Sequence, residues 1–189
     1  MKSIISLIFV LLFTFATVFQ TPPAYALQVE GRMSEVDDTP PEPPAPPVVW
    51  QPLDVIPLSA DMQMQLHAAC ERHGVPLSLA LAIIQKESTF NPKAKNQKCF
   101  GLFQIHQINY TWLRASGIEP TAYTGNIDAG VMMIGGLLVK YGDVHKALMA
   151  YNCGEGGAKK LWKRGTYTTS YSRSVVKYAQ QWEEKLKLA

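Results

Sequence analysis

The chain has 189 residues, of which 47% are hydrophobic, and it carries 18 lysine and arginine residues against 15 aspartate and glutamate residues. This length and composition suit one folded domain of ordinary size with a real hydrophobic core. The three cysteines lack the spacing of zinc ligands, so we expect no metal, and we expect no cofactor.

Residues 1–26 have the pattern of a secretory signal peptide. Lys2 supplies a positive charge, Ile4 to Val18 forms an apolar run, and Ala24-Tyr25-Ala26 matches a small-x-small cleavage site. The alternative is an uncleaved membrane anchor, but the run is short for a membrane span. We therefore expect an exported protein that is periplasmic or associated with the cell wall.

Residues 27–57 are predicted to be a proline-rich, acidic linker. The tract from Thr39 to Pro47 favours extended polyproline II structure and cannot pack a core. The linker is either a spacer that sets the domain away from a partner or an inert tether. Its acidic residues are Glu30, Glu35, Asp37, Asp38, Glu42 and Asp54.

Residues 58–189 are predicted to form the single domain, and this domain is basic. Without the preceding segments the chain has 16 basic and 9 acidic residues, a net charge of +7. A basic exported domain suits an anionic polymer such as the cell wall or a membrane surface, although a solvated basic face is the plainer explanation. Nucleic acid fits the charge but not the signal peptide, so we expect no nucleic-acid partner.

The first two predicted helices lead to a single carboxylate. Ser59 can cap a helix from Ala60 to His73, which Gly74 ends. Pro76 starts an apolar second helix, and Asn91-Pro92 is expected to end it, because the residue before a proline is pushed out of the α region. Glu87 then lies on the last turn of a buried helix, where burial would raise its pKa. The alternative is a solvated residue at a helix end.

The remaining pattern is also mainly helical, with no alternating series of strands. Cys99 to Ile105 is a short apolar piece that could be extended. Asn126 or Asp128 is expected to cap the helix that runs to Tyr141. The other predicted helices cover Gln107–Ser116, Asp143–Asn152, Ala158–Arg164 and Ser170–Lys187.

Four pieces follow the segment from Glu87 to Pro92 in a fixed order. They are Gly101-Leu102-Phe103-Gln104-Ile105, Asn126-Ile127-Asp128-Ala129-Gly130, Ala150-Tyr151-Asn152-Cys153-Gly154 and, at the head of the last helix, Tyr171. This order resembles the family 1 lytic transglycosylases, the soluble lytic transglycosylase domain related to goose-type lysozyme. The resemblance implies a lysozyme-like single domain, mainly α, with at most a small β-hairpin.

The resemblance implies that Glu87 is the sole catalytic residue. It would first protonate the oxygen between N-acetylmuramic acid and N-acetylglucosamine, and then draw a proton from the muramoyl C6 hydroxyl, leaving a 1,6-anhydromuramoyl end. The alternatives are a hydrolytic muramidase on the same fold, which would need a second carboxylate, and an inactive wall-binding assembly module. Asp128 is the first residue to test as that second carboxylate.

The resemblance also implies a set of substrate-binding residues: Ser88, Gly101, Phe103, Gln104, Tyr151, Asn152 and Tyr171. One of the two tyrosines would line the cleft beside the reacting sugar, and the other would bond to the catalytic carboxylate. Phe103 is as well suited to the core as to packing on a sugar ring. Asn152 would also satisfy backbone groups at a helix end.

The chain departs from many relatives after Gln104. The continuation from Ile105 to Leu113 is closer to small specialised members, which accompany secretion, conjugation or pilus machines that cross the wall. Peptidoglycan strands and such an apparatus are therefore the expected partners. His106 replaces the usual asparagine and could contact sugar, although a structural role suits it better.

Two of the three cysteines lie in these motifs, Cys153 directly after Tyr-Asn and Cys99 just before Gly101. Both motifs should face the cleft, and an exported protein meets an oxidising compartment. A disulfide between Cys99 and Cys153 would clamp the floor of the site, with Cys70 free; pairing of Cys70 with one of them is the alternative.

Overall fold

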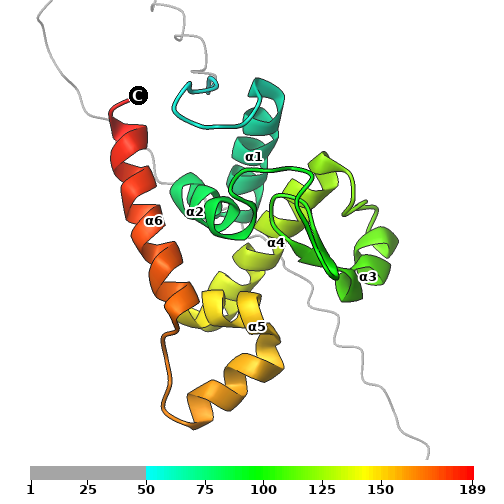
Figure 1. Ribbon diagram of the computed structural model, residues 1–189, viewed down its shortest axis with the longest axis vertical. Coiled ribbons are helices and arrows are strands. Elements are labelled where there is room, and N and C mark those ends of the chain that lie inside the picture. Colours follow the sequence, from blue (N-terminus) through cyan, green and yellow to red (C-terminus); the bar gives the residue numbers. More distant parts are fainter. Residues whose placement is uncertain (1–49) are drawn as a thin grey trace, which may run out of the picture. The chain divides into compact units, whose positions relative to one another are not determined.

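The computed structural model describes residues 50–189, so the predicted signal peptide and most of the predicted linker lie outside the described residues. The described part is mainly helical, as expected, with one small sheet (Figure 1). Its helices are α1 (Ala60–His73), α2 (Leu77–Ser88), α3 (Tyr110–Ala115), α4 (Tyr123–Tyr141), α5 (Val144–Lys163) and α6 (Ser170–Lys187), with a 3₁₀ turn at Gln107–Asn109. None of these helices is long and apolar enough to cross a membrane.

Helix α2 lies at the centre of the core. Its residues from Ala80 to Ile84 are completely buried, and it packs against α6 and α1, while α4 packs against α1 and α5. An apolar surface on all sides is expected of a helix that other helices surround. Trp182 of α6 donates from its indole Nε1 to Gln85 Oε1 of α2 at 2.7 Å, which fixes these two helices against each other.

The end of α2 differs from the prediction, because the helix stops at Ser88 and not at Asn91-Pro92. Thr89 and Phe90 both have left-handed backbone, with φ of 50° and 62°. Such backbone is uncommon for a β-branched or bulky residue and persists only where the surroundings hold it. The chain therefore turns away after Ser88 and leaves the Glu87 carboxylate beside a loop.

The prediction that Asn126 or Asp128 caps the next long helix is wrong. Helix α4 begins at Tyr123, so both residues lie inside it. Asn126 is buried; its Oδ1 accepts from the Phe103 backbone N at 3.0 Å, and its Nδ2 donates to the Phe100 and Pro120 carbonyls at 2.9 and 3.0 Å. Gly101, at φ 80°, leaves room for this amide, since a Cβ there would lie 2.4 Å from it.

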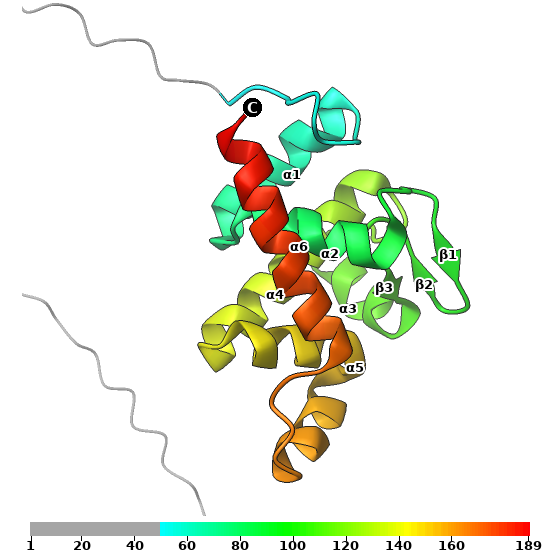
Figure 2. The same cartoon turned by 60° about the vertical axis from the view of Figure 1, so that its left-hand side comes forward.

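The sheet has three strands of two residues each, one more than a hairpin. Strands β1 (Lys95–Asn96), β2 (Cys99–Phe100) and β3 (Ile105–His106) pair antiparallel in sequence order. The sheet and α3 lie together on one side of the helical body in both views (Figures 1 and 2). The expected extended piece from Cys99 to Ile105 is therefore two strands joined by a turn.

Helix α5 is broken at Gly154, whose φ of 70° and ψ of 157° are not helical. The break agrees with the two separate helices predicted on either side of this glycine. The second half of α5 projects from the body (Figure 2), and Trp162 packs edge-on against Tyr141 of α4 at 4.9 Å between ring centroids.

Residues 50–57 fall inside the predicted linker but pack against α1. Trp50 stacks on His67, with ring centroids 4.5 Å apart, and Ile56 is buried in the core. The Gln63 side chain accepts from the Leu53 backbone N at 2.8 Å and donates to the carbonyls of Leu53, Ile56 and Leu58. The Gln63 amide, the ring stack and the burial of Ile56 together hold this segment on the domain.

Candidate active site

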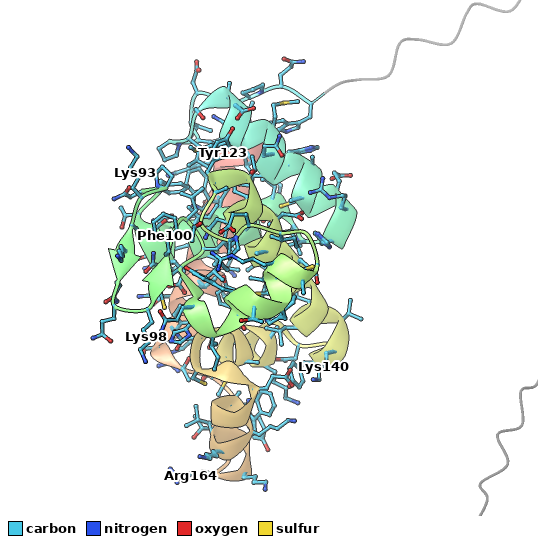
Figure 3. All side chains as sticks on the ribbon, turned by 90° about the vertical axis from the view of Figure 1, so that its right-hand side faces the viewer. Lys93, Lys98, Phe100, Tyr123, Lys140 and Arg164 are labelled. Atoms are coloured by element: carbon cyan, nitrogen blue, oxygen red, sulfur yellow. The ribbon has the colours of Figure 1, made fainter. Side chains whose placement is uncertain are left out.

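A cleft of about 1070 Å³ opens where α2 ends. Its walls come from the end of α2, the small sheet, α3, α4 and the middle of α5, so segments distant in sequence meet there. Five of the predicted site residues line it: Glu87, Ser88, Gln104, Tyr151 and Asn152. Figure 3 shows the side of the molecule that carries the sheet and α3, with Lys140 at the edge of α4.

Glu87 is a partly buried carboxyl group on the last turn of α2. Burial raises its pKa, and the hydrogen bond from Tyr171 and the charge of Lys86 only partly oppose this effect. The Tyr171 hydroxyl donates to Glu87 Oε1 at 2.5 Å. A carboxyl group whose pKa lies nearer neutral pH can both donate and accept a proton during a reaction.

Tyr171 is held in place by the start of α6. Thr169 caps this helix: its hydroxyl accepts from the Ser172 backbone N, and Ser172 Oγ in turn accepts from the Thr169 backbone N. Tyr171 is nearly buried, and burial, followed by the nearby Glu87 charge, raises its pKa. The phenol therefore stays protonated and acts as a donor to Glu87.

The second tyrosine, Tyr151, has a different partner. Its hydroxyl donates to the backbone carbonyl of Phe103 at 2.8 Å, and burial raises its pKa. Of the two tyrosines, Tyr171 is thus the one bonded to the carboxylate, and Tyr151 ties the α5 wall to the loop after β2.

Two predicted substrate-binding residues lie behind the cleft surface. Phe103 is completely buried, and its ring lies where a Cβ on Gly130 of α4 would have to be, 2.1 Å away. Gly101 is buried as well, beneath Asn126. Both residues shape the loop that the cleft rests on and are absent from its lining.

Gln104 and Ser88 line the cleft and also support its walls. Gln104, at φ 46°, donates from Nε2 to the Ala94 and Gly101 carbonyls at 3.1 and 2.9 Å. Ser88 Oγ donates to the Ile84 carbonyl at 3.0 Å within α2. His106 Nδ1 accepts from the Ile108 backbone N at 3.1 Å, a capping role that matches the structural reading of this histidine.

The second carboxylate in the cleft is Glu155 and not Asp128. Asp128 bonds to Arg72 at 2.6 Å on the α1 side and does not line the cleft. Glu155 lies one residue beyond the break in α5, where its Oε2 accepts from Lys140 Nζ at 2.5 Å and from the Tyr141 hydroxyl at 2.6 Å. The bond from Lys140, followed by that from Tyr141, lowers the pKa of Glu155.

The disulfide considered between Cys99 and Cys153 is not present. Both cysteines line the cleft, but all three cysteines of the chain are free thiols. The Cys153 thiol donates to the Met149 carbonyl at 3.0 Å, one turn back along its own helix. Burial raises the pKa of Cys99 and of Cys153. No group of histidine, cysteine, aspartate or glutamate within residues 50–189 has the arrangement of a metal site.

One wall of the cleft was not foreseen from the motifs. It consists of apolar and small residues of the 3₁₀ turn, α3 and α4: Ile108, Trp112, Met132, Met133, Gly136 and Leu137. Trp112 lies within the continuation from Ile105 to Leu113, but nothing in the sequence alone indicates that it lines the same cleft as Glu87.

The family and the fold of the chain are both represented among known proteins. Residues 64–175 match the family described as the transglycosylase SLT domain. The chain is 31% identical over 122 residues to Protein IpgF of Shigella flexneri. The alignment covers 60% of this chain and 80% of that protein, and Protein IpgF of Shigella sonnei has the same identity and coverage.

Among solved structures, an inactive mutant of the lytic transglycosylase Slt from Pseudomonas aeruginosa aligns with a TM-score of 0.56 at 20% identity. The alignment covers 65% of this chain and 24% of Slt, so the chain spans about a quarter of that protein's length. The likeness to Slt is therefore one of fold.

Proposed function

Because the chain belongs to the transglycosylase SLT domain family, we propose that its cleft cleaves peptidoglycan strands between N-acetylmuramic acid and N-acetylglucosamine without consuming water. The observation that carries this proposal is the hydrogen bond from Tyr171 to Glu87, the carboxylate that lines the cleft. A half-buried carboxyl group with a raised pKa and a single phenolic donor suits a group that must act as acid and then as base.

In the proposed reaction, Glu87 gives its proton to the glycosidic oxygen while an oxocarbenium-like centre forms at the muramoyl C1. The leaving N-acetylglucosamine takes that proton as a hydroxyl group. The muramoyl C6 oxygen then bonds to C1, and its proton passes to the Glu87 carboxylate. The enzyme regains its starting protonation state, and the product is a 1,6-anhydromuramoyl end.

Hydrolysis on the same fold is the rival function, and Glu155 is the residue that it would require. Glu155 lies in the same cleft, but Lys140 and Tyr141 already occupy one of its oxygens and hold it ionised. A carboxylate with a lowered pKa is a weaker base, and two donors compete with water for one of its oxygens. We therefore assign the proton transfers to Glu87 alone.

The mass of the products tests this assignment directly. Anhydro ends are lighter than reducing ends by one water, and we expect anhydro ends from both the wild-type protein and the Glu155→Gln variant. Reducing ends from the wild type that disappear in Glu155→Gln would establish hydrolysis instead. If Glu87→Gln digests wall as well as the wild type does, Glu87 is not the catalytic residue.

We also infer that the enzyme is exported and opens the wall locally for a secretion, conjugation or pilus apparatus. The support is the signal-peptide pattern of residues 1–26 and the resemblance of the continuation from Ile105 to Leu113 to small specialised members. In cells, Glu87→Gln should block assembly of the apparatus while growth continues. Normal assembly of the apparatus in the Glu87→Gln strain would contradict this cellular role. It would leave the proposed cleavage activity, which product mass tests separately, unaffected.

A further inference from the structure

The first turn of α6, which carries Tyr171, is bonded to a histidine of α5. His145 Nδ1 lies 3.1 Å from Ser172 Oγ, and Ser172 is completely buried. Among the side chains of residues 50–189 this is the hydrogen bond that joins α5 to α6, and the start of α6 lies beside α5 (Figure 1). His145 does not line the cleft that contains Glu87, so it can influence the reaction only through other residues.

The direction of this hydrogen bond follows from the other partners of Ser172. Its Oγ accepts from the Thr169 backbone N at 3.0 Å and donates its single proton to the Thr169 carbonyl at 3.3 Å. Because a hydroxyl group has only one proton to donate, the proton in the bond to His145 must come from Nδ1. Nδ1 carries a proton in this neutral tautomer and in the charged ring, so the bond does not depend on the charge of His145.

Apart from the bond between Tyr171 and Glu87, two side-chain hydrogen bonds in the described part of the chain join α6 to other helices. One is the bond from His145 at the start of α6. The other, from Trp182 to Gln85, lies about three turns further along the helix. The bond from His145 therefore holds the end of α6 that carries Tyr171, whereas Trp182 holds the helix near its other end.

A displacement of this turn would act on the bond between Tyr171 and Glu87. Tyr171 and Ser172 are neighbours in the first turn of α6, which Thr169 caps, so the backbone couples their positions. A hydrogen bond weakens when its donor moves away from the acceptor or out of line with it. The bond from Tyr171 lowers the pKa of Glu87, so a weaker bond would leave that pKa higher.

We propose that His145 is a positioning residue for the reaction: by donating to Ser172 it holds the first turn of α6 so that the Tyr171 hydroxyl reaches Glu87. This inference rests on the proposed function, in which Glu87 makes both proton transfers. Its consequence is that a side chain of α5 outside the cleft helps to set the proton affinity of the catalytic carboxyl group without touching the substrate.

The pKa of Glu87 and the rate of wall digestion test this role by two independent measurements. The pKa is measured by NMR titration of the glutamate carboxyl carbons, with Glu87→Gln to assign the resonance. His145→Leu, which is close in size but has no donor, should raise the Glu87 pKa and lower kcat about two- to tenfold, the effect of losing one neutral hydrogen bond. KM should stay unchanged, because His145 does not line the cleft. His145→Asn, whose amide nitrogen can take the place of Nδ1, should restore the pKa and kcat.

Two further variants keep the experiment interpretable. Lys146, the next residue of α5, lies over the ring of the exposed Tyr167 at 5.6 Å, and Lys146→Ala should change neither the Glu87 pKa nor kcat. Ser172→Ala removes the acceptor of the bond from His145 and should raise the Glu87 pKa in the same direction as His145→Leu does. It tests the proposal from the α6 side if His145→Leu does not fold, and thermal unfolding of each variant shows which of them are folded.

The double variant with Tyr171→Phe shows whether His145 acts through Tyr171. Once the Tyr171 hydroxyl is absent, His145→Leu should change neither the Glu87 pKa nor kcat any further, because the two residues would act through the same bond. An equal effect in the Tyr171→Phe background would overturn the proposal. So would an unchanged Glu87 pKa in folded His145→Leu, or a His145→Asn protein that behaves like His145→Leu.

Failure of the proposed function would give a different result. If the wild-type protein releases no anhydro ends, that function is wrong. The NMR titration does not depend on activity, so it would still show whether His145 holds Tyr171 on Glu87.

Discussion

Two carboxylates, Glu87 and Glu155, line the same cleft, and their surroundings shift their pKa values in opposite directions. Glu87, at the end of the buried helix α2, has its pKa raised by burial, whereas Glu155, beyond the break in α5, has its pKa lowered by Lys140 and Tyr141. Each accepts a hydrogen bond from a tyrosine, at 2.5 Å for Glu87 and 2.6 Å for Glu155. Burial of the helix end at Glu87 and the position of Lys140 beside Glu155 thus account for the opposite pKa shifts.

We expect the largest difference between Glu87 and Glu155 in enzyme activity, when the tyrosine hydroxyl that donates to each carboxylate is removed in turn. Tyr171→Phe should lower kcat about 10- to 100-fold, the cost of losing a hydrogen bond to a charged group in the working site. The Tyr171 bond lowers the pKa of Glu87, so its loss should also move the Glu87 limb of the pH–rate profile to higher pH.

Tyr141→Phe is the matched control for that experiment, because it removes the equivalent hydroxyl from Glu155. Activity and the pH profile should stay close to those of the wild type. If Tyr141→Phe shifts the profile as Tyr171→Phe does, both carboxylates take part in proton transfer and the assignment to Glu87 alone fails.

The next effect concerns the break that places Glu155. Gly154 has backbone angles that only glycine adopts readily, so Gly154→Ala should reduce the free energy of unfolding by roughly 2 kcal/mol. Gly156→Ala nearby, where a Cβ meets nothing and φ is not left-handed, should be neutral or stabilising by up to about 1 kcal/mol. Denaturant unfolding measures both, and equal values would mean that the break is not held in the native state.

The smallest effect is a pair of opposite trends in stability with pH. The folded state binds more protons at Glu87 than the unfolded state between the ordinary and the raised pKa, so stability falls as pH rises through that interval. Glu87→Gln should therefore melt at a higher temperature than the wild type above the interval, and at the same temperature in acid.

The contribution of Glu155 to stability should change with pH in the direction opposite to that of Glu87. Its lowered pKa stabilises the folded state above the ordinary carboxyl pKa, and this contribution is lost as pH falls through the lowered value. Glu155→Gln should melt slightly below the wild type at neutral pH, by little because the ion pair is exposed. Melting curves over a pH series measure both variants. If both variants change the melting temperature in the same direction at neutral pH, the two carboxylates do not have opposite pKa shifts.

Features set by local chemistry were predictable from the sequence. The bounds of α1 follow from Ser59 and Gly74. Glu87 lies on the last turn of α2 as predicted, although the helix ends at Ser88 and not at Asn91-Pro92. Gly154 likewise predicts the break between the two halves of α5.

Features set by packing between distant segments were not predictable in the same way. Asn126 has the side chain of a cap, but α4 begins at Tyr123, and its amide instead holds the loop at Gly101. Glu155 enters the cleft only because α4 supplies Lys140 and Tyr141 beside it. Trp112 lies within the continuation from Ile105 to Leu113, but its place in the lining of the cleft depends on how α3 packs.

The hydrogen bonds between Gln63 and residues 53–58 attach the segment before α1 to that helix. A force applied at Trp50 would first have to break the ring stack on His67 and the bonds from one amide to three backbone positions. All of these contacts load α1, whereas Glu87 and Tyr171 belong to the α2–α6 pair. A pull transmitted through Trp50 would therefore act first on α1, which carries neither Glu87 nor Tyr171.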